Sequence, residues 1–298
     1  MKNTSLLIPL VLAGLLSLTF ASNEPAATKS AQSHQEVIAI LQTAPHPALD
    51  AVKNSFKKEL ENQLGQDVIF IEQNGFGQMS SLQTMAQSFH QKKNINLVLA
   101  IGTPAVQAMA SVEKKRPIVF AAVTDPSILK IDLEKSQVFG ISDGVEASEQ
   151  IQQIKASFPS VKRIGLIFSV CEANSIGAIQ KLKEAIEKQG LESIEIGLQL
   201  ASEIGSILES SSSKCDLWLA PTDNLVAMSM PLISRIAQKK QLPIVTSDIM
   251  LFDQGATAAF GIDYNQAGVE AANLALSLLK NSKPVPHVQL MQARWVKR

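Results

Sequence analysis

The chain has few of the residues on which disulfide scaffolds and metal centres depend. Among 298 residues there are two cysteines, Cys171 and Cys215, and four histidines. Cys171 follows the apolar run Ile164–Phe168, whereas Cys215 precedes the run Asp216–Ala220. If the two runs are neighbouring parallel strands, the thiols lie at opposite edges of the sheet, about 16 Å apart and too far for a disulfide. We therefore expect two free thiols, no metal site and no cofactor.

Neither sign of charge is in excess. The 27 Lys and Arg residues balance 27 Asp and Glu residues, and no basic block stands out. Nucleic acids and anionic membranes attract clustered positive charge, so neither is an expected partner. An apolar content of 46% with 18% charged residues instead describes a globular chain with a sizeable core. Its length allows two α/β lobes.

The signatures of several enzyme classes are missing as well. The sequence contains no G-x-G-x-x-G after its first expected strand, no G-x-x-x-x-G-K-[ST], no G-x-S-x-G and no His/Cys metal spacing. Asp125 and Asp223 could perform acid–base chemistry in an exported enzyme, but no spacing requires it. We expect a binding protein and not an enzyme.

The first 35 residues differ from the rest. Lys2 precedes the nearly all-apolar run Leu6–Leu18, and small residues follow it. An apolar helix of about 16 residues is roughly 24 Å long, short for a hydrocarbon core of about 30 Å. We therefore expect a cleavable signal peptide over 1–21 and a polar tether over 22–35. No cysteine near the cleavage region offers a lipid anchor, so the mature protein is expected in the periplasm.

Two similar strand–helix–strand units organise the remaining chain. In Leu97–Pro126, two short runs rich in Val and Ile flank a helical pattern and end in Gly-Thr-Pro and Thr-Asp-Pro; Leu217–Asp248 repeats this order with a longer helix. Such runs predict buried parallel strands whose exits share one sheet edge, where open α/β sheets bind ligands. We expect an α/β fold with two Rossmann-like lobes and a ligand cleft between them. The expected lobes are 36–140 plus 263–284, and 141–262 plus 285–298.

Polar residues follow six of the expected strands on the cleft side. Helix N-termini come after Thr103, Asn174 and Thr222, and their free N–H groups favour a carboxylate or phosphate. Acids beside hydroxyls favour an ammonium, so the two demands together suit a zwitterion such as an amino acid. The candidate ligand-binding residues are Thr103, Pro104, Thr124, Asp125, Glu172, Asn174, Ser175, Thr222, Asp223, Asn224 and Asp248.

Each candidate also has a purely structural explanation. Ser, Thr, Asp and Asn at such places are first of all helix caps and turn formers, and Glu172 could simply favour a helix N-terminus. His46, Phe76 and Tyr264 are candidates for stacking on or gating a ligand, although isolated aromatic residues more commonly pack in cores. His46 lies between two prolines, which fits a loop position better than a catalytic base.

Seven ordered motifs carry a family resemblance: HPALD (46–50), GTPAVQA (102–108), PIVFAAVTDP (117–126), GISD (140–143), CEANS (171–175), PTDN (221–224) and GIDY (261–264). From about residue 36 to 284 the chain resembles the ABC-transporter substrate-binding proteins of type I periplasmic-binding fold, some of which bind tryptophan or phenylalanine. The resemblance implies that Thr103, Thr124, Glu172, Asn174, Ser175, Asp223 and Asp248 line the cleft. The acids would hold an ammonium, and hydroxyls and helix N-termini a carboxylate.

Two positions depart from the family pattern. Cys171 stands where similar sequences usually have Gly or Ser, and the apolar stretch 249–252 follows Asp248. Both bear on the ligand and not on the fold. We expect a monomeric receptor that closes on an amino acid and serves an ABC permease and its ATPase. A sensory module of the same fold is the alternative.

Overall fold

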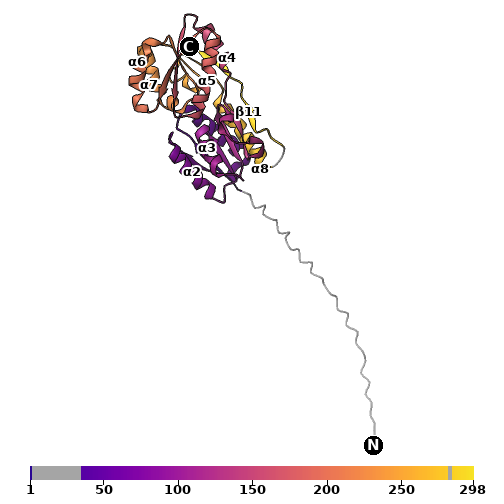
Figure 1. Ribbon diagram of the computed structural model, residues 1–298. Helices are drawn as coiled ribbons and strands as arrows, with labels where there is room; N and C mark the ends of the chain where they lie inside the picture. The colour runs from indigo at the N-terminus through magenta and orange to yellow at the C-terminus, as the bar shows by residue number, and fades with distance from the viewer. Residues whose placement is uncertain (2–34, 281–283) are drawn as a thin grey trace. The chain divides into compact units, whose positions relative to one another are not determined.

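The first of two six-stranded sheets has the strand order β11-β5-β4-β3-β1-β2, with every pairing parallel; its edge strand β11 is labelled in Figure 1. Its strands are β1 (Glu36–Gln42), β2 (Val68–Asn74), β3 (Leu97–Ile101), β4 (Ile118–Val123), β5 (Val138–Ser142) and β11 (Val288–Leu290). β3, β4 and β5 are buried at every position. Because helices cover both faces of a parallel sheet, its inner strands read as continuous apolar runs.

The second sheet has the order β12-β10-β9-β8-β6-β7. Its strands are β6 (Arg163–Ser169), β7 (Glu192–Leu198), β8 (Leu217–Ala220), β9 (Ile244–Thr246), β10 (Ala258–Gly261) and β12 (Arg294–Lys297). All pairings are parallel except that of β10 with β12, which is antiparallel.

Eight helices cover the faces of the two sheets in the part of the chain that the structure describes. On the first sheet, α1 (Pro47–Leu64) and α8 (Tyr264–Leu279) cover one face, and α2 (Met79–Gln91) and α3 (Thr103–Val112) the other. On the second, α6 (Ile204–Ser211) and α7 (Asn224–Lys239) lie opposite α4 (Ala147–Ser157) and α5 (Ala173–Lys188). Short 3₁₀ turns are η1 (Gly65–Asp67), η2 (Pro126–Leu129), η3 (Leu133–Lys135), η4 (Ala201–Glu203), η5 (Ser212–Lys214) and η6 (Ile249–Leu251).

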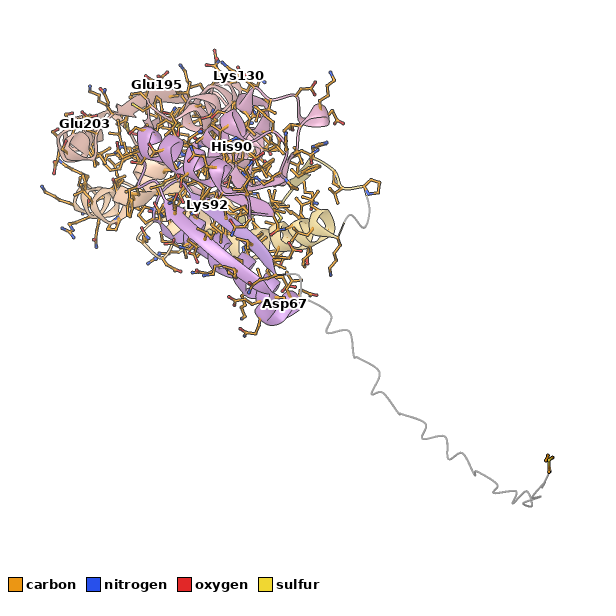
Figure 2. The ribbon with its side chains drawn as sticks, turned by 90° about the horizontal axis from the view of Figure 1, so that it is seen from below. Asp67, His90, Lys92, Lys130, Glu195 and Glu203 are labelled. Atoms are coloured by element: carbon orange, nitrogen blue, oxygen red, sulfur yellow. The ribbon has the colours of Figure 1, made fainter. Side chains whose placement is uncertain are left out.

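The computed structural model describes residues 1, 35–280 and 284–298. The predicted signal peptide, apart from Met1, and nearly all of the predicted tether lie outside the described residues. Within the described chain, no helix is long and apolar enough to cross a membrane. Charged residues such as Asp67, Lys92, Lys130 and Glu195 are exposed at its surface (Figure 2).

The predicted α/β class with largely parallel sheets is confirmed, and the strand Ile118–Val123 has the predicted bounds. The tail differs from the prediction. We assigned 285–298 to the second lobe, but β11 pairs with β5 in the first sheet and β12 with β10 in the second. β11 satisfies backbone groups on the outer edge of β5 that would otherwise face solvent. The division of the chain into two lobes stays a prediction.

The helix α8 and the two cysteines complete the description of the fold. α8 is capped by Asp263, whose carboxylate accepts from the amides of Asn265 and Gln266. Both cysteines are free, Cys171 exposed and Cys215 buried. Among the described residues, no three His, Cys, Asp or Glu side chains are grouped to hold a metal ion.

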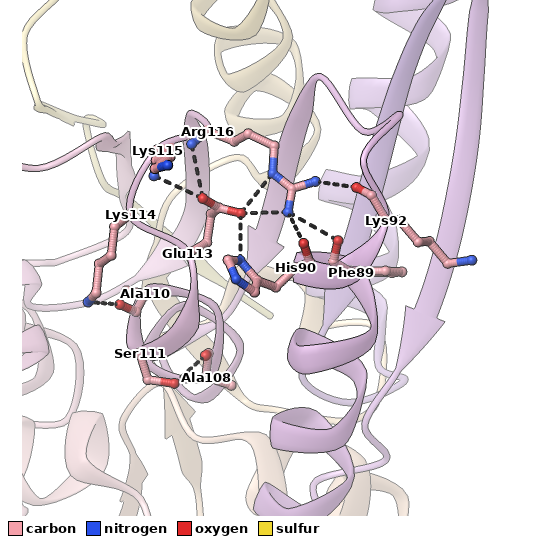
Figure 3. A network of polar contacts seen from close by, with 10 residues as sticks. All are labelled: Phe89, His90, Lys92, Ala108, Ala110, Ser111, Glu113, Lys114, Lys115 and Arg116. Atoms are coloured by element: carbon pink, nitrogen blue, oxygen red, sulfur yellow. Dashed lines mark hydrogen bonds and ion pairs between the residues drawn. The ribbon is translucent and has the colours of Figure 1, made fainter.

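A buried carboxylate joins the ends of α2 and α3 (Figure 3). The Glu113 side chain is 2% exposed; it accepts from the amides of Lys115 and Arg116, from Arg116 Nε (2.7 Å) and from His90. Arg116 also donates to the carbonyls of Phe89, His90 and Lys92, at the C-terminal end of α2. Burial raises the pKa of Glu113, but these hydrogen bonds outweigh burial and lower it to about 2.

Glu113→Gln is therefore expected to lower the free energy of unfolding by about 2 kcal/mol at neutral pH, because the carboxylate accepts four hydrogen bonds that an amide cannot all replace. The stabilisation is present above the usual pKa of 4.5 and is lost as the pH falls towards about 2. Urea unfolding of both proteins at a series of pH values measures it. The exposed Glu134→Gln serves as control, and an equal loss there, or none in Glu113→Gln, contradicts the assignment.

Candidate functional site

A small cavity lies where carboxyl ends of strands from both sheets meet. The first sheet and its helices supply His46, Leu49, Thr103, Ala122, Thr124, Asp143 and Tyr264, and the second supplies Asn174, Thr222, Asp223, Asn224, Asp248 and Leu251. The cavity volume is ≈ 10 Å³, which is enough for about one water molecule. A larger solute can therefore enter only when the walls separate.

Nine of the predicted residues line this cavity: His46, Thr103, Thr124, Asn174, Thr222, Asp223, Asn224, Asp248 and Tyr264. Pro104, Asp125, Glu172 and Ser175 do not line it. Phe76 is 64% exposed on the loop before α2. Asp143 also lines the cavity but was not among the predicted residues. Its place at the end of the GISD motif was the signal that could have identified it.

Two of the predicted acids cap α7. Glu172 accepts from the amides of Asn224 (3.2 Å) and Leu225 (3.1 Å) and from Asn224 Nδ2 (2.5 Å). Asp223 Oδ1 accepts from the Val226 amide (2.9 Å). Because both carboxylates are already at the α7 N-terminus, this helix end has no free amides for a ligand carboxylate.

The second oxygen of Asp223 joins two further elements. Asp223 Oδ2 accepts from the Ser169 amide and from Ser175 Oγ, each at 2.6 Å. The Asp223 carboxylate thus accepts three hydrogen bonds from the protein, and Ser175 Oγ is one of the three donors. Burial raises the pKa of Asp223; burial and then the nearby Asp223 carboxylate raise the pKa of Glu172 to about 7. At neutral pH, the pair thus shares less than two full charges.

Asp143, Asp248 and Tyr264 form a second acidic group. Tyr264 Oη donates to Asp143 Oδ2 (2.7 Å), whereas Asp143 Oδ1 is buried without a partner. Asp248 accepts from the Met250 amide (2.8 Å). Burial, and then the Asp143 charge, raise the pKa of Asp248 to about 7, and burial raises the pKa of Asp143. Asp143 and Asp248 therefore keep the acceptor capacity that Glu172 and Asp223 have used.

His46 contacts the opposite sheet through Asn224. Because Asn224 Nδ2 donates to Glu172, its Oδ1 is the acceptor for His46 Nε2 (3.2 Å), and His46 must carry its proton there. Burial lowers the pKa of His46, so the ring is neutral near pH 7. Its Nδ1 is then a lone-pair acceptor, and it is buried without a partner.

Four buried polar atoms of the cavity lining thus lack partners: His46 Nδ1, Asp143 Oδ1, Asn174 Oδ1 and Thr222 Oγ1. Asn174 Nδ2 donates to the Thr222 carbonyl (2.9 Å), which fixes its Oδ1 as an acceptor. Each unpaired buried polar group costs about 1–3 kcal/mol. No lysine or arginine is among the residues that line the cavity. The lining therefore has acceptors in excess and suits a ligand that brings several N–H donors.

The backbone beside the cavity is strained at one position. Ala122, in the irregular register between β4 and β5, has φ 56° and lines the cavity. An L-residue rarely adopts this left-handed conformation outside functional sites. The bulge turns the end of β4 so that both Ala122 and Thr124 line the cavity.

The model of the family described as "ABC transporter substrate binding protein" matches residues 37–295. The "Tyrosine-binding protein" of Clostridioides difficile (strain R20291) is 34% identical over 292 residues, covering 92% of this chain and 84% of its own length. An ABC domain from Streptococcus pneumonia in complex with L-Trp is 31% identical, with a TM-score of 0.81 over 86% of this chain and 89% of its own.

The ligand-free, open structure of a substrate binding protein from Clostridium difficile has a TM-score of only 0.65. Its identity, 32%, and coverage, 88% of this chain and 92% of its own, are close to those of the L-Trp complex. The chain is thus more similar in structure to the L-Trp complex than to this open structure. The chain belongs to the ABC transporter substrate-binding protein family and has the fold of type I periplasmic binding proteins.

Proposed function

We propose that this protein is the receptor of an ABC importer, that it closes on an amino acid with an aromatic or apolar side chain, and that it delivers it to the permease. The carrying observation is the cavity between the two sheets, in which four buried polar atoms lack partners. The names of two relatives, which bind tyrosine and L-Trp, support an aromatic amino acid. No catalytic step is needed for this role.

The ammonium group is proposed to bind between Asp143 and Asp248. Asp143 Oδ1 is the buried carboxylate oxygen without a partner, and Tyr264 holds the other oxygen in place. Asp223, an equally good candidate from sequence, accepts three hydrogen bonds from the protein. An ammonium would neutralise two acids whose burial disfavours their charge.

The carboxylate is proposed to bind at uncapped helix N-termini. The N-caps of α1 and α5, His46 and Glu172, make no side-chain cap hydrogen bond, and Leu49 and Asn174 in the first turns of these helices line the cavity. Thr103 at the start of α3 lines it too, but the Ala105 amide of that helix already donates to Thr43 Oγ1 (3.2 Å). α7, in contrast, is capped by Asp223. First-turn amides and the helix dipole both favour an anion.

We propose further that the mature protein works in the periplasm as a monomer, with the ABC permease and ATPase as partners. Proteins of this family are extracytoplasmic. The apolar run near the N-terminus supports export. A smaller size of the purified, exported protein than of the full chain, seen by mass spectrometry, would show the cleavage.

Thermal unfolding against the twenty amino acids tests the function. A ligand that binds only the folded state raises the midpoint, by about 5 °C or more at 100 times the dissociation constant. We expect the shift with tryptophan, tyrosine or phenylalanine. If no amino acid changes the midpoint, the proposed ligand class is wrong.

Affinity should fall as the medium becomes more acidic. Asp248, with a pKa of about 7, is protonated below that pH and must release its proton to pair with an ammonium. The dissociation constant should then rise up to about tenfold per pH unit below 7. Burial lowers the pKa of His46 from its usual 6.5, so its protonation sets in at lower pH than that of Asp248. The neighbouring Glu172, with a pKa of about 7, adds to the same trend only if the ammonium reaches it.

The same shifts act on the ligand-free protein with the opposite sign. Raised carboxyl pKa values contribute stability that is full below the unfolded-state pKa, about 4, and is lost as the pH rises through about 7.

The proposed pH dependence of binding is tested by calorimetric titrations in two buffers of different ionisation enthalpy, which measure the protons released on binding. Binding without proton release near pH 6.5, as in a dyad that is already fully ionised, would contradict the assignment.

A further inference from the structure

A second and larger cavity adjoins the first. Its volume is ≈ 230 Å³, against ≈ 10 Å³ for the first cavity. The two share Thr124, Asn174 and Thr222 as common walls. When the walls of the first cavity separate to admit a ligand, the second cavity therefore lies directly beside that ligand.

The walls of the second cavity come from both sheets. Asn174, Ala178, Lys181 and Leu182 of α5 form one wall, and their spacing places them on a single helix face. The segment 144–147, on which the chain passes from β5 to α4, forms another. The lining is mixed: Val145, Ala178 and Leu182 are aliphatic, and polar or charged side chains stand beside them, as in pockets that bind a largely apolar group and orient it by a few polar contacts.

An ion pair between η2 and α5 lies at the second cavity. Lys181 Nζ lies 2.6 Å from Asp125 Oδ2, and both residues line the cavity. Asp125 was predicted to bind the ligand directly. In the structure it pairs with the cation of Lys181 from α5 and lines the second cavity; its direct contact with a ligand stays a prediction.

One polar pair of the lining is buried. Gln150 is 1% exposed and shares a hydrogen bond with Ser247 Oγ (3.0 Å), and both residues line the second cavity. An amide and a hydroxyl can each donate or accept a further hydrogen bond. The cavity thus suits a ring that carries a polar group, such as a phenol or an indole.

We propose that the second cavity is the side-chain compartment of the binding site, and that its volume and the Gln150–Ser247 pair select a large aromatic side chain. This inference rests on the proposed function, because it assumes that the head group of an amino acid occupies the first cavity. Ala178 and Val145, on two different walls, are then specificity residues. Filling the compartment excludes large side chains and leaves the head-group contacts intact.

Ala178→Phe and Val145→Phe test the compartment from two sides. Isothermal titration calorimetry should show that either variant loses tenfold or more in affinity for the aromatic amino acid that the wild-type protein binds best, while binding of alanine or serine is unchanged or improved. Gln180→Phe, an exposed position two residues from Ala178 on the same helix, should behave as wild type. Circular dichroism and thermal unfolding confirm that each variant folds.

The outcomes separate the two proposals. If the wild-type protein binds no amino acid, the proposed function fails and the compartment with it. If the wild-type protein binds an aromatic amino acid and both filled variants bind it equally well, the function stands and the compartment is wrong. If the folded variants lose affinity equally for large and small amino acids, the compartment proposal is also wrong, because the substitutions then act on closure in general.

Discussion

Asp143→Asn should reduce the affinity for an amino acid by about 100-fold or more and leave the ligand-free protein at least as stable as the wild type. Loss of a buried charge that pairs with an ammonium costs roughly 2–5 kcal/mol of binding energy. Without ligand, Asp143 Oδ1 has no partner, so removing its charge removes a desolvation cost rather than a contact. Asparagine has nearly the same shape and can still accept from Tyr264.

The test compares calorimetric affinity and thermal midpoint in the same preparation. Asp67→Asn, an exposed aspartate on η1, controls for the loss of one negative charge and should change neither value. Unaltered affinity in Asp143→Asn would show that the ammonium binds elsewhere. A lowered midpoint without ligand would show that Asp143 is a structural residue.

Asp223→Ala should have the reverse effect and destabilise the fold by about 3–5 kcal/mol, a fall of about 10 °C or more in the unfolding midpoint. Its carboxylate is 4% exposed and holds the amides of Ser169 and Val226 and the hydroxyl of Ser175. Truncation leaves these donors buried and unpaired, and it removes the cap of α7.

Asp263→Ala provides the matched control, because Asp263 caps α8 through two amides but is exposed. Its expected cost is about 1 kcal/mol. Equal stabilities of Asp223→Ala and the wild type in urea unfolding would contradict the capping role. Reduced ligand binding in Asp223→Ala alone would not identify an ammonium site, since the variant also loses the contacts between β6, α5 and α7.

Several parts of the fold were readable without the structure. The apolar runs Ile118–Val123 and Ile164–Phe168 became the strand β4 and the centre of the strand β6, because a parallel strand covered on both faces needs apolar residues at its buried positions. The turns Gly-Thr-Pro and Pro-Thr-Asp placed Thr103 and Asp223 at the starts of α3 and α7. These are local signals, and they require no knowledge of distant residues.

The roles of the acids were not readable in this way. Five acidic residues, Asp125, Asp143, Glu172, Asp223 and Asp248, follow strands in nearly equivalent sequence contexts. Asp223 is saturated because the Ser169 amide lies 54 positions away in sequence but 2.6 Å away in space. Asp125 is neutralised by Lys181 of the other sheet. Asp143 keeps a free oxygen because Tyr264, 121 positions on, occupies only the other one.

The sequence by itself determined the α/β class, the order of strands and helices, the family and the sheet edge at which polar residues gather, since hydrophobic periodicity and turn chemistry act over a few neighbouring residues. Only the tertiary structure decided which of those polar residues cap helices and which keep unpaired atoms for a ligand. Hydrogen-bond satisfaction is a property of contacts between distant segments, and a carboxylate that is buried and unpaired differs from a capping one only by where its neighbours lie.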